Sequence, residues 1–208
     1  MTVDYLFLVR HGETKANEEG VEAGPLHYPL DKKGLRDAEF IAKTLSRMKI
    51  GAVYSSPIFR AVETAKILAR PHNLKVKTLE ELTEAKFKPR FVGKKGRHHI
   101  LTDPEAFSET NADLLARTAK AIEIIEKQVA GNVILVSHGD VITAMLEGVV
   151  ERNVKDESYY VFHPDPASLC VVEIKDRPFL ILYNYHRRQF AKFGPSAESK
   201  RRTREATY

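Results

Sequence analysis

Cysteine, tryptophan and long apolar stretches are scarce or missing in this sequence. Its 208 residues hold one cysteine, Cys170, and no tryptophan. An internal disulfide is therefore excluded, and this usage is typical of a reducing compartment. No stretch approaches the roughly 18–20 apolar residues that a membrane helix needs, and the N-terminus lacks the basic flank of a signal peptide. We expect a cytoplasmic protein with no membrane partner, in which Cys170 is a small core residue rather than a nucleophile.

Most of the chain also carries no net charge. The formal net charge is +5, and residues 186–208, with seven Lys or Arg and two Glu, account for all of it. Residues 85–101 form a second basic segment, with six Lys or Arg and no acid. A neutral core without an aromatic–basic motif argues against a nucleic-acid module. The length predicts one domain, residues 1–193, with a basic tail, residues 194–208; the oligomeric state, monomer or homodimer, stays open.

Strand-like and helix-like patterns alternate along the chain. Short apolar runs predict strands at residues 5–9, 52–55, 74–79, 133–136, 169–174 and 179–185. Apolar residues at helical spacing predict helices at 31–48, from Ser56-Pro57 onward, at 111–130 and at 141–150. Leu35, Met48 and Ala119 are among the residues expected to face the core. The predicted fold class is α/β, a three-layer α/β/α sandwich with a mostly parallel sheet and an antiparallel strand.

Two of the predicted strands end in the same way, each in a histidine followed by a glycine. The two ends read Val9-Arg10-His11-Gly12 and Val136-Ser137-His138-Gly139. In a parallel sheet both ends face one rim, where such sheets bind ligands, so the two imidazoles are expected to bracket one ligand. Arg60 adds a guanidinium near a helix N-terminus, which favours anions. This set suits a phosphoryl group, with one histidine as nucleophile and the other stabilising the transferring oxygens.

A leaving alkoxide also needs a proton donor. The carboxyl candidates are Glu80, Glu81 and Glu84, and the residues alone do not choose among them; at least one must be a solvated surface charge. Residues 85–107 show no clean period and are predicted to be an active-site excursion. Their cations either form a collar for a multiply charged substrate or pair with acids elsewhere. Gly12 is expected to let the backbone approach a ligand closely.

The order of these segments resembles the histidine phosphatase superfamily, which has the phosphoglycerate mutase-like fold. Three blocks carry the resemblance: Leu8 to Thr14 with Asn17, Ser55-Ser56-Pro57 with Arg60 and Glu63-Thr64-Ala65, and Ser137-His138-Gly139. The resemblance implies His11 as the phosphorylated nucleophile and His138 as a second catalytic residue. It implies phosphate binding by Arg10, Arg60, Asn17 and Gly139. The run from Leu82 to Phe87 is similar to the acid motif of the family and favours Glu84, although Lys88 replaces the usual glycine.

The activity that this resemblance implies is a metal-independent phosphatase acting on small phosphomonoesters through a phosphohistidine, with no cofactor. Its partner is expected to be a small anionic phosphorylated substrate, contacted by Thr14, Lys94, Lys95 and Arg97. One alternative is a phosphoglycerate mutase that depends on 2,3-bisphosphoglycerate. Such mutases carry a paired-arginine segment, whereas this chain has only isolated Arg97 and Arg117 there. Another alternative is a non-catalytic protein that binds a phosphorylated ligand in the same pocket.

Overall fold

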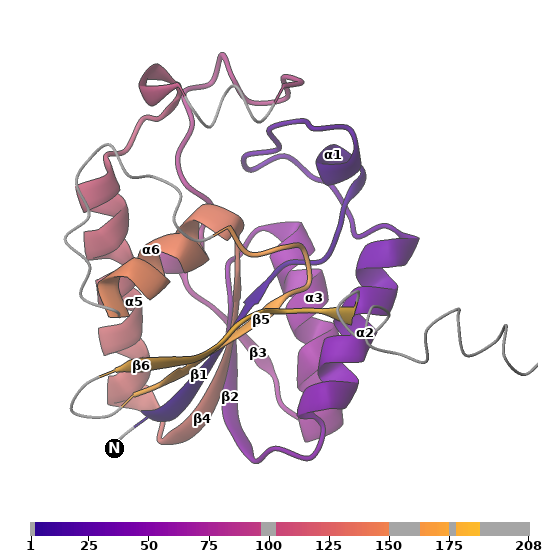
Figure 1. The fold of residues 1–208 in the computed structure, drawn as a ribbon, viewed down its shortest axis with the longest axis vertical. Coiled ribbons are helices and arrows are strands. Elements are labelled where there is room, and N and C mark those ends of the chain that lie inside the picture. The colour runs from indigo at the N-terminus through magenta and orange to yellow at the C-terminus, as the bar shows by residue number, and fades with distance from the viewer. Residues whose placement is uncertain (1–2, 97–102, 150–162, 175–177, 188–208) are drawn as a thin grey trace, which may run out of the picture.

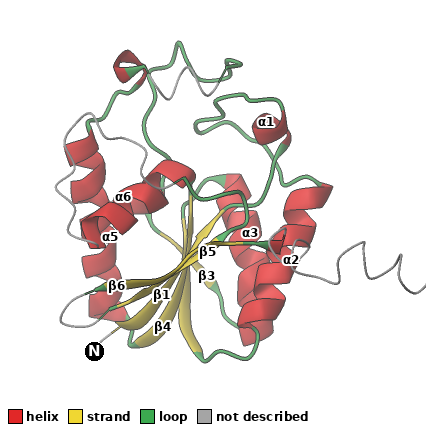
Figure 2. Ribbon diagram, viewed as in Figure 1, coloured by secondary structure: helices red, strands yellow, loops and turns green. Residues whose placement is uncertain are grey.

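A six-stranded sheet forms the centre of the computed structural model, which describes residues 3–96, 103–149, 163–174 and 178–187 (Figures 1 and 2). The strands lie in the order β3-β2-β4-β1-β5-β6. Their bounds are β1 Val3–Arg10, β2 Ile50–Ser55, β3 Val76–Thr78, β4 Gly131–Ser137, β5 Leu169–Glu173 and β6 Phe179–Tyr185. All neighbours pair in parallel except β5, which is antiparallel to β1 and to β6. The predicted mostly parallel sheet with an antiparallel strand is confirmed.

Helices cover both faces of the sheet and complete the three predicted layers. One face carries α2 (Lys32–Leu45) and α3 (Phe59–Ala69), and the other carries α5 (Asn111–Gln128) and α6 (Gly139–Val149), as Figure 1 shows. Short helical turns lie in the connections: α1 Lys15–Glu18, η1 Arg70–His72, η2 Glu80–Leu82 and η3 Pro104–Ala106. Among the described residues, no helix is both long and apolar enough to cross a membrane.

The apolar run of β1 builds two separate cores because successive side chains of a strand point to opposite faces. Leu6 and Leu8 belong to the cluster that includes residues of α5 and α6. Phe7 and Val9 belong to the cluster that includes residues of α2 and α3. A central strand of a sheet covered on both faces needs apolar residues at every position, which is why this run is unbroken. Cys170, on β5, is fully buried, and burial raises the pKa of its thiol to about 11.

Local signals explain where some helices begin and correct one prediction. Asp31 caps α2 as expected, since its Oδ1 accepts the N–H of Gly34 at 2.6 Å. In contrast, α3 begins at Phe59, so Pro57 lies ahead of the helix rather than in its first turn. The N–H of Ser56 donates to the Val136 carbonyl at 2.9 Å and extends the pairing of the sheet. That pairing keeps residues 56–58 out of the helix.

Three side chains that were expected in the core are exposed. Leu35 and Met48 are 38% and 42% exposed; Met48 lies beyond the end of α2, which has its C-cap at Ser46. Ala119 is also exposed, because α5 turns Leu114, Thr118, Ala121 and Ile125 inward. The basic tail 194–208 and Arg97 lie outside the described residues. The boundary at residue 193 therefore stays a prediction.

Candidate active site

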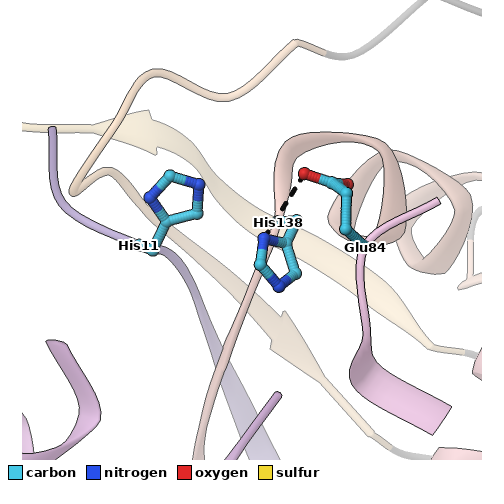
Figure 3. Close-up of side chains that lie close together, drawn as sticks. All are labelled: His11, Glu84 and His138. Atoms are coloured by element: carbon cyan, nitrogen blue, oxygen red, sulfur yellow. Dashed lines mark ion pairs between the residues drawn. The ribbon is translucent and has the colours of Figure 1, made fainter. Parts of the chain in front are cut away.

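The two histidines leave the sheet side by side. β1 and β4 are parallel neighbours in register, with Arg10 opposite Ser137, so the next residue of each strand is a histidine at the same rim. The N–H of His11 donates to the Ser137 carbonyl at 2.9 Å. The ring centroids of His11 and His138 are 5.2 Å apart, and both residues are almost fully buried (Figure 3). The parallel register alone therefore brings the two imidazoles together.

Hydrogen bonds fix the orientation of the His11 ring. Arg60 Nε donates to His11 Nε2 at 3.1 Å, and His11 Nδ1 lies 2.8 Å from the Gly12 carbonyl oxygen. An arginine N–H can only donate, so Nε2 is the acceptor and Nδ1 carries the proton of the neutral ring. The lone pair of Nε2 therefore points into the cluster of charged groups, as a nucleophile requires.

Arg60 lies at the centre of the site, in the first turn of α3. Its Nη2 is 3.0 Å from the Gly24 carbonyl oxygen, 3.2 Å from His138 Nδ1 and 3.6 Å from Glu84 Oε2. The side chain is only 2% exposed. A buried guanidinium that contacts both imidazoles, at a helix N-terminus, concentrates positive charge where an anion would bind.

Glu84 is the acidic residue that the structure brings to the histidines. Its Oε2 lies 3.3 Å from His138 Nδ1, the contact drawn as a dashed line in Figure 3, and its Oε1 accepts the N–H of Ala85 at 3.1 Å. Glu80 is exposed. Glu81 pairs with Lys120 at 2.9 Å on the surface, and that hydrogen bond lowers the pKa of its carboxyl group. Of the three sequence candidates, only Glu84 can exchange a proton with the site.

Arg10 and Gly139 pack against each other, and each is next in sequence to one of the two histidines. Arg10 is buried, and its Nη1 donates to the Pro164 carbonyl at 2.7 Å. A Cβ atom on Gly139 would lie 3.4 Å from Arg10 Cζ, so the flat guanidinium packs against the backbone where α6 begins. His138 is held from its other side, with Nε2 2.8 Å from Ser56 Oγ. Ser56 belongs to the Ser55-Ser56-Pro57 block of the family resemblance, but the sequence did not predict its contact with His138.

Four other candidates lie on two loops that pair with each other. Asn17 and Thr14 cap the short helix α1: Asn17 Oδ1 accepts the N–H and the hydroxyl of Thr14 at 3.1 and 2.8 Å. Lys94 and Lys95 are exposed, where the α1 segment meets the excursion. There the Glu22 N–H donates to the Lys94 carbonyl at 2.9 Å. Figure 1 shows both segments beyond the same end of the sheet.

Gly12 has a close neighbour within the protein itself. A Cβ atom there would lie 2.8 Å from the carbonyl oxygen of Gly34, in the first turn of α2, so the missing side chain makes room for that helix. The close approach of a ligand to the Gly12 backbone stays a prediction. The N–H of Gly12 donates to Thr64 Oγ1 at 3.0 Å, and this hydroxyl donates to the Arg60 carbonyl at 2.8 Å. Thr64 follows Arg60 by one helical turn, a spacing that offered a signal for this contact.

The site also has a possible metal-ligand set. Donor atoms of His11, Glu84 and His138 all lie within 4.8 Å of one another, and imidazole with carboxylate is a common zinc donor set. The same imidazole nitrogens, however, lie 3.1 and 3.2 Å from the Arg60 guanidinium. A fixed positive charge among the donors opposes a cation and favours an anion.

Comparisons with known proteins show what the sequence and the fold resemble. A family model described as "Histidine phosphatase superfamily (branch 1)" matches residues 6–185. "Phosphoglycerate mutase-like protein 4" of Arabidopsis thaliana is 33% identical over 70% of this chain and 71% of its own length. "Metal-independent phosphoserine phosphatase", also of Arabidopsis thaliana, is 30% identical over 86% of this chain and 80% of its own. The solved structure of Bacillus stearothermophilus YhfR superposes with a TM-score of 0.77 at 24% identity, over 88% of this chain and 97% of that one.

Proposed function

Because this chain belongs to the histidine phosphatase superfamily (branch 1), we propose that it is a metal-independent phosphatase that hydrolyses small phosphomonoesters through a phosphohistidine on His11. The observation that carries the proposal is the orientation of that ring. Its Nδ1 is tied to the Gly12 carbonyl and its Nε2 is turned toward Arg60, 3.1 Å away. A neutral imidazole held in this way presents a lone pair to any phosphoryl group that binds the guanidinium.

In the first half of the reaction, His11 Nε2 attacks phosphorus as the bond between phosphorus and the ester oxygen breaks. Arg10 and Arg60 neutralise the charge on the phosphoryl oxygens, as does His138. Glu84, entering this step protonated, gives its proton to the departing oxygen. The products of this step are the free alcohol, the phosphohistidine and the Glu84 carboxylate.

In the second half, water attacks phosphorus and the bond to Nε2 breaks. The Glu84 carboxylate takes the proton that the water loses, so the acid is regenerated and inorganic phosphate leaves. The 3.3 Å between Glu84 Oε2 and His138 Nδ1 supports this cycle, because it keeps the carboxyl group at the edge of the phosphate site. Ser56 holds the far nitrogen of His138 and fixes that ring for both steps.

The substrate that fits is a small phosphate ester with a further negative charge. Lys94 and Lys95 are exposed on the excursion, which pairs with the loop of residues 14–30 that contains α1. In that loop, the carbonyl of Gly24 contacts Arg60. Thr14 and Asn17 lie at the start of the same loop. A relative at 30% identity is a phosphoserine phosphatase, and a carboxylated phosphomonoester of that kind is the class we infer, with no cofactor, in the cytoplasm.

A phosphoglycerate mutase would use the same site and return the phosphoryl group to its product. We keep this alternative because one relative, at 33% identity, is named as a phosphoglycerate mutase-like protein. Phosphate release from a panel of phosphorylated metabolites, measured with and without 2,3-bisphosphoglycerate, separates the two. A phosphatase releases phosphate without it, whereas a mutase interconverts phosphoglycerates and requires it. A non-catalytic binding protein would do neither.

His11→Ala tests the nucleophile. We expect it to reduce kcat by on the order of 10³-fold or more and to abolish acid-labile phosphate labelling, with the circular dichroism spectrum unchanged. His72→Gln, in η1 beyond the C-terminal end of α3, is the matched control and should be labelled like the wild type. EDTA should leave the wild-type rate unchanged. Labelling of His11→Ala, or loss of activity in EDTA that added zinc restores, would contradict the mechanism.

Glu84→Gln tests the acid. Protonation matters most for a poor leaving group. This variant should therefore slow the hydrolysis of phenyl phosphate far more than that of p-nitrophenyl phosphate, whose leaving group, p-nitrophenolate, is already a stable anion. Glu81→Gln is the matched control because Glu81 lies on the same segment but pairs with Lys120. Equal losses on the two substrates would assign Glu84 a structural role.

A further inference from the structure

We propose that Arg117, together with Glu109, is a positioning residue that holds Glu84 at the reacting atoms. This inference rests on the role of Glu84 as the proton donor of the proposed reaction. It concerns residues outside the phosphate site: Arg117 lies on α5, and Glu109 comes two residues before that helix begins. Neither belongs to the sequence blocks that point to phosphate chemistry.

Arg117 binds the backbone immediately before the acid. Its Nη1 donates to the carbonyl oxygens of Glu81 and Thr83, both at 2.8 Å. Its Nη2 reaches the carbonyl oxygen of Glu84 itself at 3.5 Å. A single guanidinium therefore contacts three carbonyl groups within four consecutive residues, and the last of them carries the acid.

Glu109 binds Arg117 and also the backbone after the acid. Its Oε1 accepts from Arg117 Nη2 at 2.7 Å, and its Oε2 accepts from Arg117 Nε at 3.3 Å. The same Oε1 accepts the N–H of Lys86 at 2.8 Å. Both side chains are largely buried, at 14% and 6% exposed, so solvent screens this pair weakly. The two side chains thus fix the chain on both sides of Glu84.

The contacts matter because no helix or strand orders this stretch. The 3-10 helix η2 ends at Leu82, and residues 83–86 belong to no regular element. Ser137 Oγ donates to the Leu82 carbonyl at 2.7 Å, and the Ser108 N–H donates to the Lys86 carbonyl at 2.7 Å, so the segment is anchored at its two ends. A displacement of about 1 Å of a catalytic group is enough to lower a rate on the order of 10²-fold. Between these two anchors, Arg117 holds the carbonyl groups of Thr83 and Glu84.

The geometry also argues against a substrate-binding role for Arg117, the role that an arginine near the acid would have in a mutase. A guanidinium carries five N–H donors, and Arg117 has five acceptors: three backbone carbonyl oxygens and both oxygens of Glu109. A substrate carboxylate or phosphate would have to displace one of them. Arg117 therefore acts on the reaction through the position of Glu84, without touching the substrate.

The test compares leaving groups in variants of the full chain. Arg117→Met removes all five bonds but keeps a helix-forming side chain of similar length, and Arg117→Lys keeps the charge but not the fork. Lys120→Met is the matched control, since Lys120 comes from the same helix and pairs with the side chain of Glu81. Each variant is assayed on phenyl phosphate and p-nitrophenyl phosphate, alone and combined with Glu84→Gln.

We expect Arg117→Met to lower kcat on phenyl phosphate by on the order of 10²-fold, with KM nearly unchanged and p-nitrophenyl phosphate slowed less than about threefold. Arg117→Lys should lie between this variant and the wild type, and Lys120→Met should match the wild type. In the Glu84→Gln background, Arg117→Met should add no further selectivity, because the acid is already lost. If Arg117→Met does not fold, Glu109→Gln takes its place: it keeps an acceptor for the Lys86 N–H and removes the anion that orients Arg117.

Three results would overturn the proposal, and they can be told apart. If Glu84→Gln discriminates between the leaving groups but Arg117→Met slows both equally, the positioning role is wrong and the acid assignment stands. The positioning role is also wrong if the selectivity of Arg117→Met persists in the Glu84→Gln background. If Glu84→Gln itself shows no selectivity, the acid assignment fails, and the positioning role fails with it.

Discussion

Each side chain of the phosphate site is held before any ligand arrives. Arg60 contacts His11, His138 and the Gly24 carbonyl, so the charges that a phosphoryl group would meet are already oriented. Preorganised donors of this kind stabilise a transition state without reorganising during the reaction, and this is often the largest single contribution to catalysis. The residue that links this order to the backbone is Thr64, which accepts from the Gly12 N–H and donates to the Arg60 carbonyl.

Thr64→Val tests that link. The substitution keeps the shape of the side chain but leaves the buried N–H of Gly12 without its acceptor, which destabilises a protein by about 1–3 kcal/mol. We expect a lower melting temperature and, because Gly12 carries the carbonyl that fixes the His11 ring, a clear fall in kcat. Thr64→Ser keeps the hydroxyl and should retain most of the activity. Equal losses in the two variants would show that the methyl group, and not the hydrogen bond, matters.

At the scale of elements, the site depends on one close crossing of backbone. The chain that leaves β1 passes the first turn of α2 so closely that neither side has room for a side chain. A Cβ atom on Gly34 would lie 2.2 Å from the Glu13 carbonyl oxygen, and one on Gly12 would lie 2.8 Å from the Gly34 carbonyl oxygen. The N–H of Asp31 donates to the Glu13 carbonyl at 2.9 Å and closes the crossing.

Gly34→Ala should therefore be strongly destabilising although alanine favours helices. A contact of 2.2 Å with backbone can be relieved only by moving α2 or the segment that follows His11, so we expect a marked fall in melting temperature and in kcat. Gly148→Ala is the matched control: it also lies within a helix, and a Cβ atom there has nothing within 4 Å. That variant should be neutral or more stable by about 0.5–1 kcal/mol. A stable, fully active Gly34→Ala would contradict this account of the crossing.

At the scale of the whole molecule, charge is distributed unevenly around a neutral core. The structure divides the cations of the excursion: Lys88 pairs with Glu105 at 2.8 Å, and Arg90 lies over the Phe91 ring at 4.8 Å from its centroid. Lys94 and Lys95 are exposed where the two loops meet. The pairing of Lys88 with an acid agrees with one of the two alternatives for this segment, and the collar stays a prediction. We predict that Lys94 and Lys95 attract multiply charged substrates.

Ionic strength tests this attraction. Salt shortens the range of charge interactions from about 30 Å at 0.01 M to about 8 Å at 0.15 M. For phosphoserine, kcat/KM should fall several-fold over this range, and for p-nitrophenyl phosphate it should fall little. Replacing Lys94 and Lys95 by Ala should remove most of the difference without changing kcat. Replacing Arg47 and Lys49, exposed before β2 at the opposite end of the sheet, changes the net charge equally and should have no such effect. An unchanged salt dependence in the Lys94/Lys95 variant would leave these lysines as solvated surface.

The sequence by itself determined the frame of this protein because its signals are local. An unbroken apolar run predicts a central strand, and two such strands that end in histidine predict that the imidazoles meet at one rim. The cap at Asp31 fixed the start of α2 for the same reason, since a cap bonds only to its own first turn. Arg60 could be placed near a helix N-terminus from its neighbours, although the pairing of Ser56 with β4 moved the helix start to Phe59.

Only the tertiary structure decided which residues act together. Three glutamates lie within five residues; the resemblance to the family's acid motif favoured Glu84, and the physical reason, its distance to His138, 54 positions further along the chain, is visible only in the structure. The partners of Arg117 are backbone carbonyl groups and Glu109, and no residue pattern in the sequence reveals these contacts. The close approach of Gly12 to α2 likewise becomes visible only once that helix has been placed. In each case the deciding contact joins segments distant in sequence, and its geometry exists only once the sheet and its helices have packed.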